Sequence, residues 1–157
     1  MLILLDIDGV MVPANSWKKP EFMDDGFPAF NLKSVKALQR ILSVTNASVV
    51  LTTSHKTRYK ISQWKDLLKS RGINPKKVQK LVTNSLQTSR KDEILDWYLN
   101  KHVPNEDFVI IDDDKILNGL PENLKSNLIL TSPSIGLTDD LADEAISILQ
   151  KNAYQLH

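Results

Sequence analysis

The chain has 157 residues, a length that suits one domain with a sizeable core. Its composition, 41% hydrophobic and 25% charged, indicates an ordinary soluble globular protein, and its formal net charge of +1 gives no general electrostatic reason to expect nucleic acid or a membrane as partner. Because the chain contains no cysteine, disulfides and thiolate metal sites are excluded.

Apolar runs alternate with segments of helical periodicity from the first residues onward. A buried strand is predicted over residues 2–7, and this short apolar run without a basic leader predicts a cytoplasmic protein without a signal peptide. Residues 9–30 contain several prolines and glycines and are predicted to form a loop. Asn31 is predicted to cap a helix. A strand over 48–53 and a helix over 57–70 follow.

The second half of the chain continues the alternation. Ser89 is predicted to cap a helix, with Asp92 at the reciprocal position of a capping box. The remaining strands and the last helix are predicted at residues 78–83, 108–112, 128–130 and 139–151. Because the strands are wholly apolar and alternate with helices, we expect an α/β fold with a parallel sheet covered on both faces, in a single domain over residues 1–157.

Polar side chains stand at or just after the carboxyl ends of several predicted strands and at the start of one predicted helix. Parallel sheets bind ligands at the carboxyl ends of their strands, so these side chains are expected to meet. They comprise carboxylates, hydroxyls and two basic groups in the first turn of a helix: Asp6, Asp8, Asp112 and Asp113; Thr53 and Ser54; Arg90 and Lys91. Basic residues in a first turn oppose the helix dipole, and a local rule broken in this way indicates function.

Converging carboxylates repel one another unless a cation lies among them. Hard oxygen ligands without a cluster of histidine or cysteine suit magnesium (Mg2+), which commonly works together with a phosphate. The Thr53 hydroxyl and a cation at Arg90 or Lys91 would hold the remaining phosphate oxygens. One aspartate can attack phosphorus to give an aspartyl-phosphate, while a second moves protons.

Four segments resemble, in the same order, the motifs of the haloacid-dehalogenase-like (HAD) phosphohydrolases, and together they cover most of the chain. The segments are Asp6-Ile7-Asp8-Gly9-Val10, Val49-Val50-Leu51-Thr52-Thr53-Ser54, Arg90-Lys91-Asp92-Glu93-Ile94 and Ile110-Ile111-Asp112-Asp113-Asp114. The resemblance implies a three-layer Rossmann-like domain and a magnesium-dependent phosphatase.

The resemblance also implies roles for individual residues. Asp6 would be the nucleophile and a magnesium ligand, and Asp8 would be the general acid and base that ligates magnesium through its backbone carbonyl. Thr53 would bind the transferring phosphoryl group. Asp113 would be the second acidic ligand, with Asp112 beside it.

Further candidates for the expected site are a glycine, a serine, a basic residue and a histidine. Gly9 and Ser54 are assigned to substrate binding, since a glycine lets the chain turn off the strand beside a phosphate. The basic residue of the third motif stays open, because the register favours Arg90 and the residue type favours Lys91. His55 follows the second motif and is a further candidate.

Neither gap after the first two motifs leaves room for a full cap domain, so an open site suited to bulky phosphoesters is expected. Trp17 is a candidate for its entrance. The second and third motifs and the segment after residue 130 are similar to compact HAD domains of nucleic-acid repair proteins. Expected substrates are therefore a nucleic-acid end, a phosphoprotein or a small phosphoester, with no membrane partner. A phosphate-sensing domain and a catalytically decayed binding module remain alternatives, and the oligomeric state stays open.

Overall fold

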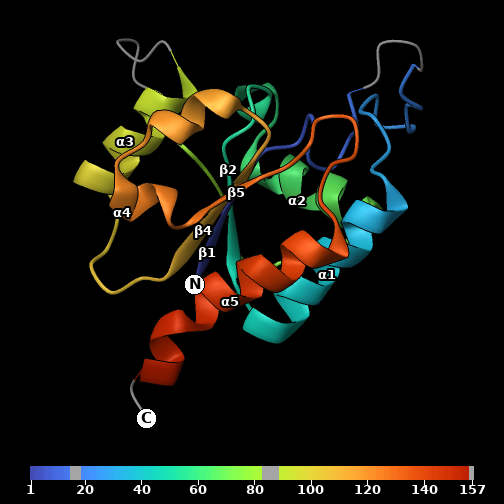
Figure 1. Ribbon diagram of the computed structural model, residues 1–157. Helices are drawn as coiled ribbons and strands as arrows, with labels where there is room; N and C mark the ends of the chain where they lie inside the picture. Colours follow the sequence, from blue (N-terminus) through green and yellow to red (C-terminus); the bar gives the residue numbers. More distant parts are fainter. Residues whose placement is uncertain (15–18, 83–88, 156–157) are drawn as a thin grey trace.

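Five parallel strands form a sheet in the middle of the protein (Figure 1). The computed structural model describes residues 1–14, 19–82 and 89–155. The strands are β1 (Leu2–Leu5), β2 (Ser48–Leu51), β3 (Val78–Lys80), β4 (Phe108–Asp112) and β5 (Leu128–Leu130). Their spatial order is β3-β2-β1-β4-β5, so β1 lies at the centre and pairs with β2 and β4.

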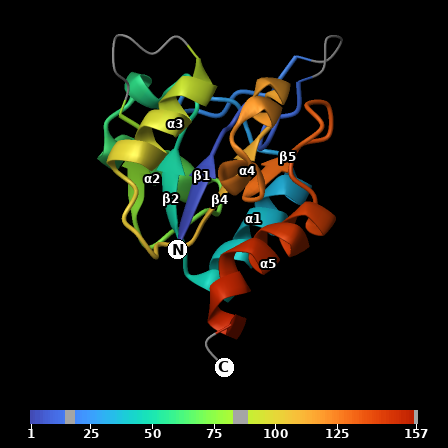
Figure 2. The same ribbon diagram turned by 60° about the vertical axis from the view of Figure 1, so that its left-hand side comes forward.

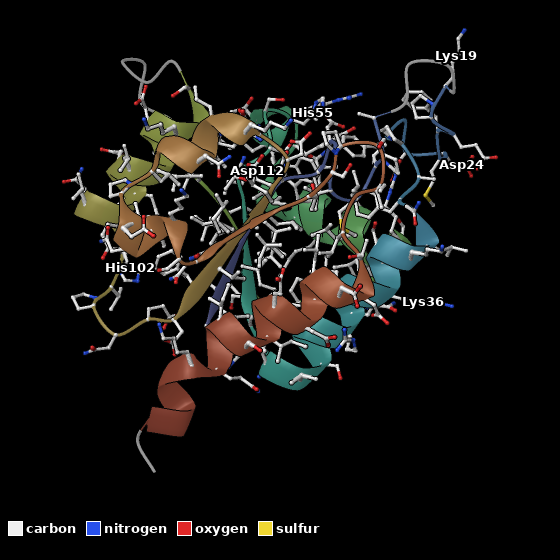
Figure 3. The ribbon with its side chains drawn as sticks, viewed as in Figure 1. Lys19, Asp24, Lys36, His55, His102 and Asp112 are labelled. Carbon is white, nitrogen blue, oxygen red and sulfur yellow. The ribbon has the colours of Figure 1, made fainter. Side chains whose placement is uncertain are left out.

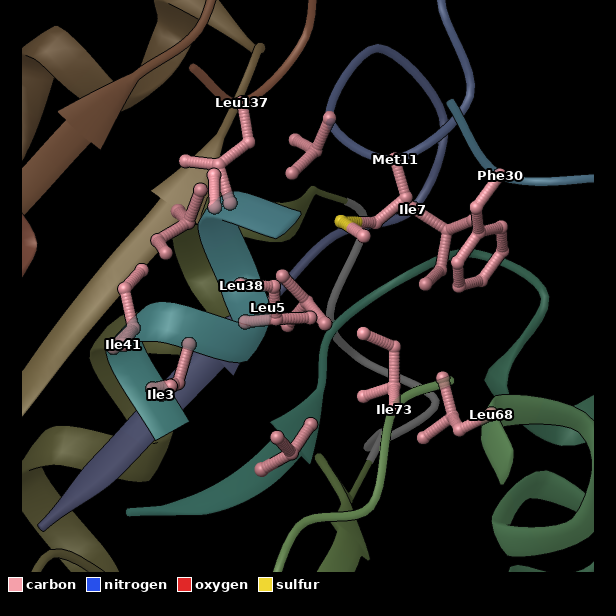
Figure 4. Packing of buried hydrophobic residues seen from close by; sticks show 14 of the residues in the cluster. Ile3, Leu5, Ile7, Met11, Phe30, Leu38, Ile41, Leu68, Ile73 and Leu137 are labelled. Carbon is pink, nitrogen blue, oxygen red and sulfur yellow. The ribbon is translucent and has the colours of Figure 1, made fainter. Parts of the chain in front are cut away.

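Helices cover both faces of the sheet, as expected for this α/β class (Figure 2). Alternation along β1 sends Ile3 and Leu5 to one face and Leu4 to the other. The first face packs against α1 (Leu32–Thr45), α2 (Ile61–Ser70) and α5 (Asp139–Gln155). The second packs against α3 (Arg90–Asn100), the 3-10 helix η2 (Lys115–Gly119) and α4 (Glu122–Lys125). Figure 4 shows the first cluster, where Leu38 and Ile41 of α1 pack near β1.

Two predicted helix caps are confirmed. Asn31 Oδ1 accepts hydrogen bonds from the backbone N–H of Lys33 at 2.8 Å and of Ser34 at 3.4 Å, and α1 begins at the next residue. Ser89 Oγ accepts from Asp92 N at 3.2 Å at the start of α3. These caps satisfy backbone donors that have no partner within the helix.

Several predicted boundaries are wrong. The strands predicted to reach residues 7, 53 and 83 end at Leu5, Leu51 and Lys80. The predicted helix over 57–70 is divided into a 3-10 turn, η1 (Lys56–Arg58), and α2, because Tyr59 and Lys60 are extended. The last helix continues past residue 151 to Gln155. η2 and α4 were not predicted, since four or five residues show no helical period.

The loop between β1 and α1 is anchored to the end of α2 by Arg71. The Arg71 side chain is 2% exposed, and Nη1 lies 2.7 Å from Asp25 Oδ2 while Nη2 donates to Phe27 O at 2.8 Å. Phe22 and Pro28 form an isolated antiparallel bridge in this loop. In the described residues between β1 and β3, the only α-helices are α1 and α2, which both pack on the sheet, so no cap stands over its edge.

None of the described helices combines the length and the apolar composition that crossing a membrane requires.

Candidate active site

Asp6 and Asp112 lie side by side at the carboxyl ends of β1 and β4. Alternation along both strands places their side chains on the face that α3 covers, together with Leu4 and Ile110. The pairing continues past the end of β1, because Asp6 N donates to Ile111 O at 3.1 Å. Asp6 is 2% exposed and Asp112 is fully buried. The sheet therefore brings two buried carboxylates together.

Arg90, the first residue of α3, forms ion pairs with both carboxylates. Its Nη1 lies 2.9 Å from Asp6 Oδ2 and 3.0 Å from Asp112 Oδ2. Lys91 points elsewhere, since its Nζ would lie 3.0 Å from a Cβ added at Gly119. Within the described parts of the chain, no carboxylate pairs with Lys91. Of the two basic candidates, the fold brings Arg90 to the aspartates.

The electrostatics of this cluster favour a further positive charge. Burial raises the pKa of Asp6 to about 8, and the neighbouring Asp112 adds to the shift while Arg90 opposes it. Burial also raises the pKa of Asp112, again against the effect of Arg90. Burial disfavours the charged guanidinium, yet Asp6 and Asp112 outweigh it and the pKa of Arg90 is raised. One arginine therefore does not fully compensate the buried carboxylates.

The donor atoms fit a divalent cation. One carboxylate oxygen from each of Asp6, Asp112 and Asp113 lies within 4.8 Å of the others. An all-oxygen set suits magnesium, which prefers carboxylates and water as ligands. The raised pKa of Asp6 agrees with this fit, because a cation placed among the carboxylates would stabilise their charged forms.

Gly9 makes room for one of these carboxylates. Its φ is +79°, and a Cβ at this position would collide with the carboxylate of Asp113. Both backbone groups of Gly9 are hydrogen-bonded. Gly9 N donates to Val12 O at 2.8 Å, and Thr131 Oγ1 donates to Gly9 O at 2.7 Å. The predicted turn at Gly9 is present, and the carboxylate of Asp113 lies where a side chain on Gly9 would stand.

The Asp8 side chain is exposed, unlike the carboxylates of the buried cluster, and contacts His55. The Asp8 side chain is 55% exposed, and its Oδ2 lies 2.8 Å from His55 Nε2. The His55 ring packs edge-on against Phe27, with ring centroids 5.5 Å apart. In the view of Figure 3, His55 and Asp112 both lie toward the end to which the strands run, and His102 lies well away from both. Asp8 and Asp6 therefore have different surroundings, one exposed and the other buried.

The hydroxyl of the second motif is fixed by a local turn. Thr53 is fully buried, and its Oγ1 accepts a hydrogen bond from His55 N at 3.2 Å. The hydroxyl hydrogen is left to donate to a ligand oxygen. Ser54, the neighbouring candidate, is exposed. Trp17, the candidate for the entrance, lies outside the described residues.

Three supporting residues were not predicted from the sequence. Lys56 and Glu93 form a buried ion pair at 2.9 Å, with side chains 6% and 15% exposed, which joins the loop after β2 to the first turn of α3. Thr131 holds the turn at Gly9. Lys56 and Glu93 each lie within or next to a motif, but nothing in those motifs indicates that the two side chains meet.

Two comparisons with known proteins bear on the family of this chain. A search of curated proteins finds no match. A family model described as the HAD domain in Swiss Army Knife RNA repair proteins matches residues 2–142. The match covers the sheet, every residue of the cluster and the start of α5, and the family indicates a phosphohydrolase type of function. The chain therefore belongs to the family of HAD domains found in Swiss Army Knife RNA repair proteins.

Proposed function

We propose that the protein is a magnesium-dependent phosphatase that works through an aspartyl-phosphate on Asp6. The observation that carries this proposal is the convergence of Asp6, Asp112 and Asp113 within 4.8 Å, with Arg90 paired to the first two. Asp8 follows the end of β1, and Thr53 follows the end of its neighbour β2, beside this cluster. The proposed nucleophile, cation ligands, phosphate-binding donors and proton carrier thus come from the same edge of the sheet.

The reaction has two balanced steps. In the first, an Asp6 carboxylate oxygen attacks phosphorus, the bond from phosphorus to the leaving oxygen breaks, and that oxygen takes a proton from the Asp8 carboxyl. In the second, Asp8 removes a proton from a water whose oxygen attacks phosphorus, which releases phosphate and restores the Asp6 carboxylate. The Thr53 hydroxyl and Arg90 stabilise the charge on the phosphoryl oxygens.

Asp6, Asp112 and Asp113, together with the backbone carbonyl of Asp8, are the groups that would hold magnesium. The bound ion would neutralise charge on the phosphoryl oxygens during in-line transfer. Arg90 lies between Asp6 and Asp112 and so limits their mutual repulsion. Gly9 allows Asp113 to approach the same place.

The substrate that we propose is a phosphate at the end of a nucleic acid. The description of the matched family ties its members to RNA repair. No cap covers the cluster in the described residues between β1 and β3, and an uncapped edge admits a bulky ester. The net charge of +1 gives little general attraction for a polyanion, so recognition is expected to depend on the terminal phosphate.

The test is hydrolysis of p-nitrophenyl phosphate in magnesium by the purified protein and by Asp6→Asn. The wild type should release nitrophenol, and Asp6→Asn should lose about 10³-fold or more of kcat. Asp24→Asn, which changes an exposed aspartate remote from Asp112, is the matched control and should keep full activity (Figure 3). Unchanged turnover in Asp6→Asn would exclude the proposed nucleophile.

A panel of phosphorylated oligonucleotides, sugars, nucleotides and phosphopeptides tests the substrate class. The oligonucleotides should show the highest kcat/KM. A kcat/KM on them no higher than on the other esters would exclude a role at nucleic-acid ends. Titration calorimetry with magnesium and a phosphate mimic tests the decayed module, and the lifetime of the aspartyl-phosphate tests the phosphate sensor. A protein that binds neither is a decayed module, and one that accumulates a lasting aspartyl-phosphate is a phosphate sensor.

A further inference from the structure

The carboxylate of Asp8 has a neighbour, His55, that has no role in the proposed reaction. His55 Nε2 lies 2.8 Å from Asp8 Oδ2, although the Asp8 side chain is 55% exposed. An exposed carboxyl without a partner turns freely about its side-chain bonds, whereas a general acid acts only when one oxygen faces the leaving group. A hydrogen bond to Oδ2 fixes the carboxyl and leaves Oδ1 for the substrate.

The imidazole of His55 is itself held in place. Its ring packs edge-on against Phe27 at 5.5 Å, and Phe27 is fully buried against Trp64 at 5.6 Å. The backbone of His55 is fixed on both sides, because its N–H donates to Thr53 Oγ1 at 3.2 Å and its carbonyl accepts from Arg58 N at 2.9 Å. Both the ring and the backbone of His55 therefore have defined partners that hold the imidazole beside Asp8.

We propose that His55 is a positioning residue that directs the proton of Asp8 to the leaving oxygen. In this arrangement His55 Nε2–H donates to Asp8 Oδ2, and Asp8 Oδ1 carries the proton that passes to the leaving oxygen as its bond to phosphorus breaks. His55 touches neither the phosphoryl group nor the leaving group. This inference rests on the proposed phosphatase function and adds the residue that orients its general acid.

The dependence of rate on the leaving group distinguishes this role from others. A poor leaving group, such as an alkyl alcohol, needs a proton in the transition state, whereas dinitrophenolate departs without one. The parameter to measure is kcat/KM, since it reports the steps up to the first irreversible one, in which the leaving group departs. The substrates are a series of phosphate esters from alkyl phosphate through phenyl phosphate to 2,4-dinitrophenyl phosphate.

His55→Phe is the principal variant, because it keeps a ring on Phe27 and removes the donor. We expect kcat/KM to fall by about 10²-fold for alkyl phosphate and by about twofold or less for dinitrophenyl phosphate. His55→Gln keeps an N–H donor and should recover part of the loss on the alkyl ester. Combined with Asp8→Asn, the His55→Phe change should cost nothing further, because the group that it orients is already absent.

The outcomes separate this inference from the proposed function. A loss of equal size across the whole series would overturn the positioning role, because it would mean that His55 acts on the phosphoryl group or only on the fold. Unchanged rates would overturn it as well. If His55→Phe does not fold by circular dichroism, His55→Ala gives the same comparison. A wild-type protein inactive on every ester would overturn the phosphatase function itself and this inference with it.

Discussion

The carboxylate of Asp113 occupies the space that a side chain on Gly9 would need. Gly9 also has φ +79°, a conformation that L side chains rarely adopt. Two independent requirements, one of backbone and one of space, therefore fix glycine at this position. The second requirement links the turn after β1 directly to a proposed metal ligand.

Gly9→Ala should destabilise the fold and weaken magnesium binding. The backbone alone should cost about 1–2 kcal/mol of unfolding free energy, and displacement of Asp113 should add to that cost. Gly26→Ala is a matched control, because Gly26 has the same φ of +79° and nothing lies within 4 Å of its Cβ position. Denaturant unfolding and magnesium titration of both variants check this. Equal effects of the two changes would contradict the role of Asp113.

Arg90 should matter for catalysis far more than Lys91. Arg90 pairs with Asp6 and Asp112, whereas Lys91 lies beside Gly119. We expect Arg90→Gln to lower kcat/KM on p-nitrophenyl phosphate by about 10²–10³-fold and Lys91→Gln to change it only a few-fold. Arg90→Lys should recover little, because an ammonium does not reproduce the geometry of the guanidinium. A larger loss in Lys91→Gln would reverse the assignment.

The buried carboxyl of Asp6 should make the metal-free protein less stable as pH rises. The folded state keeps the proton until its pKa of about 8, while the unfolded state releases it near 3.8. Between these values the folded state binds more protons, so rising pH lowers the free energy of unfolding. Asn does not titrate, and Asp6→Asn should therefore gain Tm over the wild type from pH 5 to pH 8 in EDTA.

Asp8→Asn provides the comparison for that experiment, because the Asp8 carboxylate is 55% exposed rather than buried. Thermal unfolding of the three proteins at several pH values is the measurement. A difference in Tm between Asp6→Asn and the wild type that stays constant from pH 5 to pH 8 would show that Asp6 carries no raised pKa in the folded state.

The Arg71–Asp25 pair should stabilise the loop that supports Phe27. Arg71→Met removes a buried cation with several partners and should lower the unfolding free energy by about 3 kcal/mol or more. Hydrogen bonds from Arg71 hold the pKa of Asp25 below its ordinary value of 3.8. The stabilisation by Asp25 is therefore full above pH 3.8 and is lost as pH falls through the lowered pKa of the folded state.

Asp25→Asn tests this pH dependence. Its deficit in stability relative to the wild type should be largest near neutral pH and should shrink below pH 3.8, where the carboxyl of the unfolded wild type is also protonated. Urea unfolding of both proteins near neutral pH and below pH 3.8 is the measurement. A deficit that persists unchanged in acid would mean that the charge of Asp25 contributes nothing.

The central strands and the caps could be predicted because their signals are local. Four or five consecutive apolar residues predict β1 and β4, and Asn31 and Ser89 predict the starts of α1 and α3. The strand ends were placed too late, because hydrogen bonding continues past the last strand residue, as at Asp6 N to Ile111 O. The sequence of one segment does not show at which residue its regular pairing with the neighbouring strand ends.

The site was predictable in its residue types but not in its contacts. Rules for parallel sheets indicated that Asp6 and Asp112 would meet, but register and residue type disagreed between Arg90 and Lys91. Only the direction of α3 places Arg90 on the aspartates. The contacts of His55 with Asp8 and of Lys56 with Glu93 join different elements, so a single sequence carries no sign of them.

The hydrogen bond from Thr131 Oγ1 to Gly9 O joins residues 122 positions apart. Val10 is likewise held by Leu137, whose N–H donates to Val10 O at 2.8 Å. Chains are made from the N-terminus, so the ribosome releases Asp6 and Asp8 long before Asp113 and Thr131. The nascent chain thus carries the proposed nucleophile beside an unfinished turn, and the proposed phosphate transfer would begin only after Thr131 and Leu137 have emerged and docked.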